Sequence, residues 1–267
     1  MKKLTSAIFF ISLVNFSAAQ EGTQSESSNE FELITDRPDL TESSVLVPHK
    51  YLQIESGYVI ESAKTAASNL KSYTYNSTLF RYGLFKNLEL RVGLEYLGQT
   101  TINNQTEEKL QSGLGPLYTG FKFNLWKEAG WRPELSLLTG IIMPFTANEN
   151  YKPTSSLKDV KLLLTNTLSD KVSVTYNLGP EWTDGFDLNT FFYSVALGIG
   201  LDDKFGLFIE GYGWFYANSS NEHFADAGFT YLARPNLQLD VSFGSALSAA
   251  AKPYRFFGFG ASYRLPR

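Results

Sequence analysis

The chain has 267 residues, with 23 basic and 27 acidic side chains and no cysteine. No basic run or basic helix accompanies this slightly acidic balance, which excludes nucleic-acid binding as an interpretation. The absence of cysteine excludes stabilisation by disulfides. Aromatic residues make up 15 % of the chain and 21 residues are glycine, and the length suits one domain after an N-terminal targeting segment.

Residues 1–19 have the pattern of a secretory signal peptide. Two lysines follow the initial methionine, residues 4–16 are mostly apolar, and three small residues come next. This apolar run is shorter than the roughly 20 residues that a membrane-spanning helix needs, which favours a cleavable signal. We expect cleavage near Ala19, so that the mature chain begins at Gln20.

A polar leader, residues 20–48, follows the signal peptide. Its first part, residues 20–34, is rich in Ser, Glu and Gln, which is typical of a flexible segment. Its second part is also polar but is not of low complexity. We single out its charged residues as an N-terminal motif, and we expect the main domain at residues 49–267. The motif residues are Asp36, Arg37, Asp39 and Glu42.

Apolar and polar residues alternate with a period of two after the leader, which predicts β-strands with one apolar face. The clearest case is residues 88–96, where Leu, Leu, Val, Leu and Tyr alternate with Glu, Arg, Gly and Glu. Three consecutive leucines hide the phase of the strand at 158–168. The predicted strands are 50–61, 71–84, 88–97, 114–126, 133–144, 158–168, 171–181, 190–201, 205–216, 224–233, 236–246 and 254–265.

The connectors between these strands alternate between short and long. Tight turns are expected at 85–87, 169–170, 202–204 and 234–236, and larger polar loops at 62–70, 98–113, 145–157, 182–189, 217–223 and 247–253. Outer-membrane β-barrels have short periplasmic turns and long extracellular loops, whereas a soluble sandwich has no reason to sort its loops in this way. We therefore predict an all-β fold, a transmembrane antiparallel β-barrel of about 12 strands in a single domain, in the outer membrane of a Gram-negative-type bacterium.

The two faces of the predicted strands differ in polarity. One phase carries apolar residues such as Leu90 and Val92 and is predicted to face lipid, where a midplane arginine or lysine would cost about 2–4 kcal/mol. The opposite phase carries glycines and charges and is predicted to line the lumen. The candidate lumen or constriction residues are Glu55, Arg81, Glu89, Arg91, Glu95, Lys122, Glu134, Glu210, Asp226 and Asp240.

The turn at 85–87 predicts the register of the strands that it joins. It places Leu84 opposite Leu88 and Arg81 opposite Arg91. Like charges directly opposite each other are destabilising unless they are neutralised. Acids on the same strands are within reach, and so are the acids of the leader if it folds inside. The cluster is either an ion-pair mesh that rigidifies the barrel or a constriction that selects solutes.

Several short motifs resemble, in their order and spacing, a family of outer-membrane proteins named for the MetA pathway of phenol degradation and often described as transporters. The resemblance covers nearly all of the mature chain. It implies an outer-membrane barrel that takes part in the passage of small, aromatic or hydrophobic compounds. The motifs are Asp36–Ser43, Leu52–Gly57, Phe80–Leu84, Leu88–Arg91, Gly113–Gly115 leading to Lys122, Asp226–Tyr231, Asn236–Asp240 and Gly258–Arg264.

Enzymatic motifs are weak. A barrel hydrolase needs a Ser–His pair, and the nearest approach to one is Ser220 beside His223 in a polar loop. No phosphate-binding loop, metal cluster or redox motif occurs in the sequence, so we expect no cofactor, no metal site and no enzymatic activity. We expect a passive channel or transporter, with outer-membrane lipid and a small solute as partners. The alternatives are a structural or adhesive barrel with a plugged lumen and, third, a lipid-modifying barrel enzyme.

Overall fold

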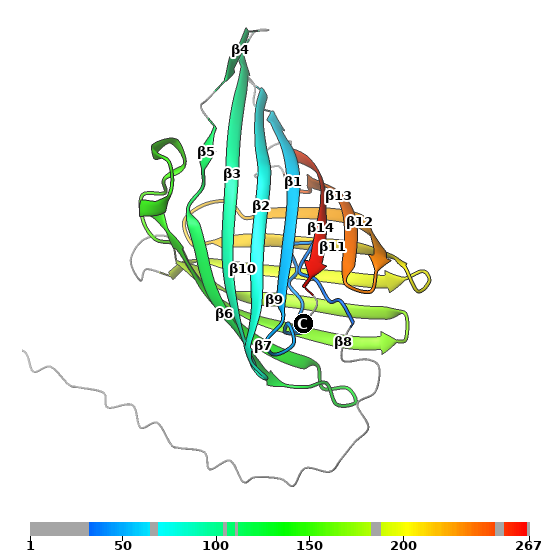
Figure 1. The fold of residues 1–267 in the computed structure, drawn as a ribbon. Coiled ribbons are helices and arrows are strands. Elements are labelled where there is room, and N and C mark those ends of the chain that lie inside the picture. Colours follow the sequence, from blue (N-terminus) through cyan, green and yellow to red (C-terminus); the bar gives the residue numbers. More distant parts are fainter. Residues whose placement is uncertain are drawn as a thin grey trace, which may run out of the picture. The chain divides into compact units, whose positions relative to one another are not determined.

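The computed structural model describes residues 32–64, 69–103, 106–109, 112–182, 188–248 and 254–265. Within these residues, twelve long antiparallel strands form one sheet that closes on itself as a barrel (Figure 1). The first strand, β1 (Leu52–Lys64), pairs with β2 (Asn69–Phe85) on one side and with the last strand, β14 (Tyr254–Arg264), on the other. A closed ring leaves no sheet edge, so its backbone polar groups can pair within lipid.

The remaining strands follow in chain order. They are β3 (Leu88–Asn103), β4 (Thr106–Lys109), β5 (Gly113–Leu114), β6 (Leu117–Trp126), β7 (Glu134–Met143), β8 (Lys158–Ser169), β9 (Val172–Trp182), β10 (Leu188–Gly200), β11 (Phe205–Tyr216), β12 (Glu222–Arg234) and β13 (Leu237–Ala246). The short β4 and β5 pair only with β3 and are not members of the ring. Two 3-10 helices, η2 (Pro144–Thr146) and η3 (Glu149–Tyr151), lie between β7 and β8. Over the described residues, no helix is long and apolar enough to cross a membrane.

The predicted fold class and strand order are confirmed, with two differences around β3. This strand continues to Asn103 and pairs with β4, so part of the predicted loop 98–113 is a hairpin. The strand predicted at 114–126 is divided into β5 and β6. Pro116 lies in the gap between them, and because proline has no N–H to donate it interrupts a strand ladder.

The register between β2 and β3 also matches the prediction for the pairs around Arg81. Arg81 lies opposite Arg91, as predicted. The predicted pairing of Leu84 with Leu88 is wrong, because a bulge after Gly83 shifts the ladder and places Phe85 opposite Leu88. A bulge adds one residue to one strand, and the hydrophobic pattern gave no sign of it.

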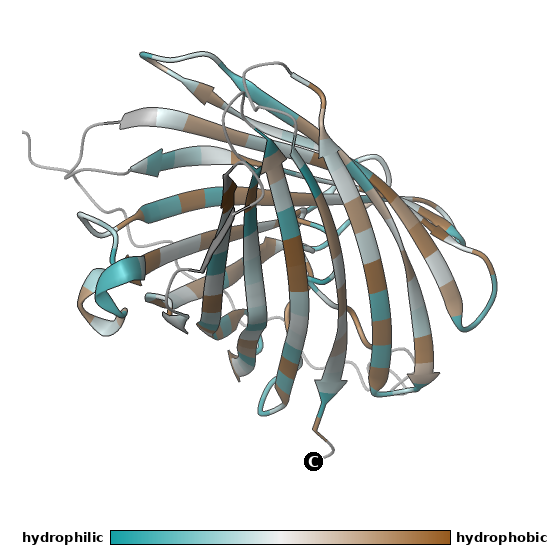
Figure 2. Ribbon diagram, turned by 90° about the horizontal axis from the view of Figure 1, so that it is seen from above, coloured by the Kyte–Doolittle hydropathy of each residue, from teal (hydrophilic) through white to brown (hydrophobic). Residues whose placement is uncertain are grey.

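Side chains alternate between the two surfaces of the barrel wall. Figure 2 shows hydrophobic and hydrophilic residues alternating along the strands. Outward-facing residues such as Val195 and Phe229 are 48 % and 52 % exposed, as expected for the band that meets lipid. The phase of β8, which the sequence left open, is now clear, because Leu163 is fully buried on the inner side and Leu162 is 37 % exposed on the outer side.

Candidate lumen site

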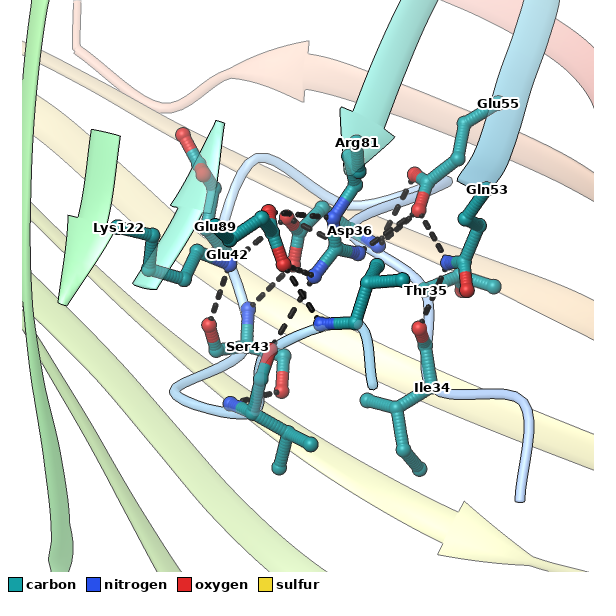
Figure 3. A network of polar contacts seen from close by, with 12 residues as sticks. Ile34, Thr35, Asp36, Glu42, Ser43, Gln53, Glu55, Arg81, Glu89 and Lys122 are labelled. Atoms are coloured by element: carbon teal, nitrogen blue, oxygen red, sulfur yellow. Dashed lines mark hydrogen bonds and ion pairs between the residues drawn. The ribbon is translucent and has the colours of Figure 1, made fainter. Parts of the chain in front are cut away.

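Residues 32–48, which we call the plug, run through the interior of the barrel (Figures 1 and 3). The plug contacts strands around the inner wall through hydrogen bonds of 2.7–2.9 Å, but it does not extend the sheet. This part of the polar leader, residues 32–48, therefore lies inside the barrel. The contacts join Glu32 to Arg264 of β14, Leu40 to Glu210 of β11, Glu42 to Asn177 of β9, Ser44 to Thr165 of β8 and Val47 to Glu89 of β3.

Asp36 is the centre of an ion-pair network between the plug and the barrel (Figure 3). Its Oδ2 lies 2.6 Å from an Arg91 guanidinium nitrogen, 2.9 Å from Lys122 Nζ and 3.2 Å from an Arg81 guanidinium nitrogen. Its Oδ1 accepts a hydrogen bond of 2.9 Å from the Ser43 N–H. Three basic side chains on β2, β3 and β6 thus converge on one carboxylate of the plug, and all of them are buried.

Four acids surround these three bases. Glu55 and Glu89 come from β1 and β3, whereas Asp36 and Glu42 come from the plug. The barrel alone would have three bases against two acids, a local net charge of +1. With the plug in place, three bases face four acids, a local net charge of −1. The plug therefore neutralises the two opposed arginines and reverses the sign of the charge at this level of the lumen.

The two aspartates of the plug differ in their electrostatic surroundings. Burial acts to raise the pKa of Asp36, but the charges of Arg81 and Lys122 outweigh it and hold this pKa well below its usual range. Burial, reinforced by the nearby carboxylate of Glu210, raises the pKa of Asp39 well above its usual range. At neutral pH Asp36 is therefore the ionised anchor of the plug, while the environment of Asp39 favours its neutral form.

Glycines on the inner wall give the plug the room that it needs. An added Cβ at Gly57 or Gly260 would collide with the guanidinium group of Arg37, and one at Gly83 would collide with the carbonyl oxygen of Pro48. The carbonyl oxygen of Gly83 also accepts a hydrogen bond of 2.7 Å from the backbone N–H of Lys50, which follows the plug. Close approach of the plug backbone and side chains therefore depends on these missing side chains.

The structure brings some of the predicted site residues together. The largest group is the network around Asp36. Arg37 forms a separate ion pair of 3.0 Å with Asp240 of β13. Glu210 and Asp226 lie directly opposite each other on β11 and β12. The residues in the network around Asp36 are Glu42, Glu55, Arg81, Glu89, Arg91 and Lys122.

Two predicted site residues lie apart from these groups. Glu134 is the first residue of β7, next to the connector from β6, where it pairs with the exposed Lys127 at 2.9 Å. Glu95 is exposed and accepts a hydrogen bond of 3.3 Å from Ser77. Neither contacts the plug in the described part of the chain.

The sequence did not predict that inward-facing aromatic residues of several strands gather in one group, which we call the aromatic wall. It is formed by β10, β11, β12 and β14. Phe192, Tyr212 and Phe224 are buried against one another, and Trp214 and Tyr254 pack against them. Ring centroids of neighbouring members are 5.2–5.9 Å apart, a normal spacing for interacting rings. The lumen is therefore polar around the plug and aromatic along this part of the wall.

A separate hollow of about 380 Å³ lies on the outer surface across β6, β7 and β8. Its lining includes Phe121, Ile141, Val160 and Trp182. Lys122 points into the lumen, so its chain neighbour Phe121 points outward. Phe121 lies opposite Thr139, and Ile141, two residues further along β7, lies opposite Lys158, so these residues share the outward-facing phase. The hollow faces away from the lumen and is not part of the plug site.

The fold and the plug define the class of protein, an outer-membrane β-barrel of twelve strands with an internal N-terminal segment. The chain belongs to the family described as "Putative MetA-pathway of phenol degradation", whose model matches residues 35–265. The family resemblance seen in the sequence motifs is confirmed. No curated protein sequence matches the chain.

Solved structures of outer-membrane proteins from Gram-negative bacteria share this fold. An outer-membrane channel from Pseudomonas putida F1 matches with a TM-score of 0.70 and 12 % identity, over 91 % of this chain and 100 % of that one. The translocator domain of the autotransporter NalP from Neisseria meningitidis matches with a TM-score of 0.51 and 13 % identity, over 82 % and 90 %. The KdgM porin, solved in complex with disordered oligogalacturonate, matches with a TM-score of 0.51 and 8 % identity, over 79 % and 98 %. At these identities the likeness is one of fold.

Proposed function

We propose that this protein is an outer-membrane channel for small aromatic or hydrophobic molecules and that the plug controls its path. The observation that carries this proposal is the way the plug is held. Residues 32–48 fill part of the lumen through side-chain hydrogen bonds and ion pairs, without joining the strand ladder. A segment held in this way can leave without unfolding the barrel. Family membership and the aromatic wall support the choice of solute.

The charged network around Asp36 is the proposed constriction. Charged residues that line a narrow part of a pore select the solutes that pass, and here three bases and four acids meet in the lumen. The network lies near the tight turn between β2 and β3, which places it toward the periplasmic side. In this arrangement the charged side chains of the wall are held rigid by ion pairs with the seated plug, and they line the constriction when the plug moves.

Locking the plug to the wall is expected to lower the conductance. Thr41 Oγ1 lies 2.8 Å from Ser194 Oγ of β10, and the chain has no cysteine, so Thr41→Cys with Ser194→Cys creates one defined disulfide. In planar bilayers the oxidised double variant should conduct less than the same protein after reduction, and Thr41→Cys alone should not respond to oxidant. Equal conductance in both redox states would show that the path avoids the plug. No conductance in either state would favour a structural or adhesive barrel.

An enzymatic role is less well supported by the contacts of His223. Its Nδ1 lies 2.8 Å from the hydroxyl of Tyr193 and its ring packs beside that of Phe215. Its backbone N–H, not its ring, bonds to Ser248. A hydrolase would need a serine hydroxyl at the imidazole, so we propose that the barrel conducts solutes and does not modify lipid.

The mature N-terminus is expected at Gln20. We propose that residues 1–19 are a signal peptide, that 20–48 are the leader and that 49–267 form the barrel, which directs the protein to the outer membrane. Residues 1–31 lie outside the described residues, so the support for cleavage near Ala19 is the pattern of a positive start, an apolar run and small residues. Mass spectrometry of protein purified from outer membranes should give a chain that begins at or next to Gln20. A membrane-inserted chain that retains Met1 would contradict it.

A further inference from the structure

The aromatic wall already holds one ammonium group. Nζ of Lys161, from β8, lies 4.4 Å from the centroid of the Phe192 ring. The same nitrogen forms ion pairs with Glu181 at 3.3 Å and Asp159 at 3.7 Å. An ammonium over an aromatic face is attracted by the ring, and the attraction is stronger away from water. Two carboxylates and a ring thus bind a cation at one place on this wall.

A second pair of carboxylates lies on the neighbouring strands of the same wall. Glu210 of β11 is directly opposite Asp226 of β12, and the two residues are 2 % and 7 % exposed. Neither forms an ion pair with a basic residue in the described ranges of the chain. Acids directly opposite each other repel when both are ionised. This pair therefore has the two carboxyl groups of the Lys161 site, but no basic side chain of the described residues forms an ion pair with it.

The two carboxylates differ in how they are held. Glu210 accepts hydrogen bonds from the backbone N–H of Leu40 at 2.8 Å and from the Thr41 hydroxyl at 2.5 Å. Oδ1 of Asp226 is buried and has no hydrogen-bond partner among the described residues. A buried carboxylate oxygen without a donor is costly. A positively charged or donor group would satisfy this oxygen, and the seated plug holds the neighbouring Glu210 in place.

Aromatic rings lie next to this pair. Tyr212 and Phe224 form the next inward-facing pair on the same two strands, with stacked rings whose centroids are 5.2 Å apart. Tyr254 meets the Phe224 ring edge-on at 5.5 Å. Inward-facing positions on one strand are two residues apart, so these rings border the carboxylates directly.

We propose that Glu210 and Asp226, together with Tyr212 and Phe224, bind an organic cation whose ammonium group meets the carboxylates and the ring faces. This site rests on the proposed function, because the cation reaches it through the lumen. A bare metal ion fits less well, since it takes six or more oxygen ligands when it is calcium and no group of three metal-binding side chains occurs among the described residues. Because Leu40 and Thr41 position Glu210, the site is complete only when the plug is seated.

Choline and its uncharged isostere 3,3-dimethylbutan-1-ol separate charge from shape. Isothermal titration of the full mature protein in detergent is expected to show binding of choline and at least about tenfold weaker binding of the alcohol. Asp226→Asn keeps the volume of the side chain and should weaken choline binding by about tenfold or more. Phe224→Leu should also weaken it, because the leucine side chain has no aromatic face.

Glu222→Gln is the matched control, since it removes one negative charge from the same strand at a residue that pairs with Tyr216. It should leave choline binding unchanged. Equal binding of both probes, unchanged binding in Asp226→Asn, or an equal loss in Glu222→Gln would overturn the site. Folding of each variant is checked by its unheated gel mobility, and Phe224→Leu decides the question if Asp226→Asn does not fold. Equilibrium binding does not require transport, so a barrel that binds choline without conducting would contradict the channel and leave the cation site.

Discussion

Replacement of Asp36 by alanine is expected to unseat the plug, raise the conductance and shift selectivity toward anions. In the native protein, Oδ2 of Asp36 contacts Arg81, Arg91 and Lys122 within 3.2 Å. Removing one partner of a buried ion pair typically costs about 3–5 kcal/mol, because the remaining charge stays buried without compensation. Here three buried cations lose the carboxylate that they share, so the plug loses its strongest anchor.

The direction of the selectivity change follows from the local charges. Without Asp36 the three bases face three acids, and once the plug leaves with Glu42 the bases face only Glu55 and Glu89. The constriction then carries a net charge of +1, and a positive ring in a low-dielectric wall favours anions. Conductance and reversal potentials in a salt gradient across a planar bilayer measure both effects.

Asp39→Ala is the control for this experiment, because Asp39 lies in the same segment and forms no ion pair with a basic residue in the part of the chain that the structure covers. It should change conductance and selectivity much less than Asp36→Ala. If both variants behave like the parent protein, the ion-pair network is only a structural mesh. If Asp36→Ala fails to fold, as judged by its unheated gel mobility, then the network is needed for the barrel itself and the plug is not a separable element.

Val92→Arg is expected to lower the stability of the inserted barrel by about 2–4 kcal/mol. Val92 is the fifth residue of β3, opposite Phe80 of β2 and Thr119 of β6, and it lies on the face opposite to the buried Arg91. An outward arginine at this level would have to enter the apolar part of the bilayer. Urea-induced unfolding from lipid vesicles, followed by unheated gel mobility, measures the loss.

Leu168→Arg also introduces an arginine at an exposed apolar position, but at a different depth. Leu168 is 61 % exposed near the end of β8, beside a tight turn. The cost of an outward arginine falls to about 0–1 kcal/mol near the membrane interface, so this variant should unfold almost like the parent protein. Similar losses in both variants would show that the two positions lie at the same level, against the assigned orientation of the strands.

The fold could be predicted from the sequence because most strands of a membrane barrel alternate apolar residues that face lipid with polar residues that face the lumen. From Leu88 to Tyr96 of β3, apolar residues alternate with charged residues and one glycine, and the short turn after β2 predicts the register that sets Arg81 opposite Arg91. The pattern fails where both faces of a strand are apolar. Phe192 faces inward, yet its chain neighbours Phe191 and Tyr193 on the outer face are also aromatic, so residue types alone do not distinguish the two faces at this position.

The candidate site was predictable only in part. The charged residues of the inner phase were visible, but the position of the plug depends on contacts between residues far apart in the chain. Asp36 contacts Lys122, which is 86 residues away in the sequence, and Arg37 contacts Asp240, which is 203 residues away. No local pattern specifies such pairs, because they arise only when the ring closes around the leader. For Glu134 the phase along the strand predicted a lumen residue. Its place at the first position of β7 instead lets it pair with the exposed Lys127, away from the plug.

The strands differ in length around the ring, and this gives the protein an uneven outline at the cell surface. β2 has 17 residues and β3 has 16, whereas β13 has 10, which at about 3.3 Å per residue makes β2 about 56 Å long and β13 about 33 Å. With a tilt of about 40°, β2 rises about 43 Å against an apolar band about 25 Å tall, while β13 rises only about as far as the band. The β2 and β3 side (Figure 1) therefore stands above the lipid as a ridge, and an antibody or bacteriophage that approaches the cell would touch this ridge first.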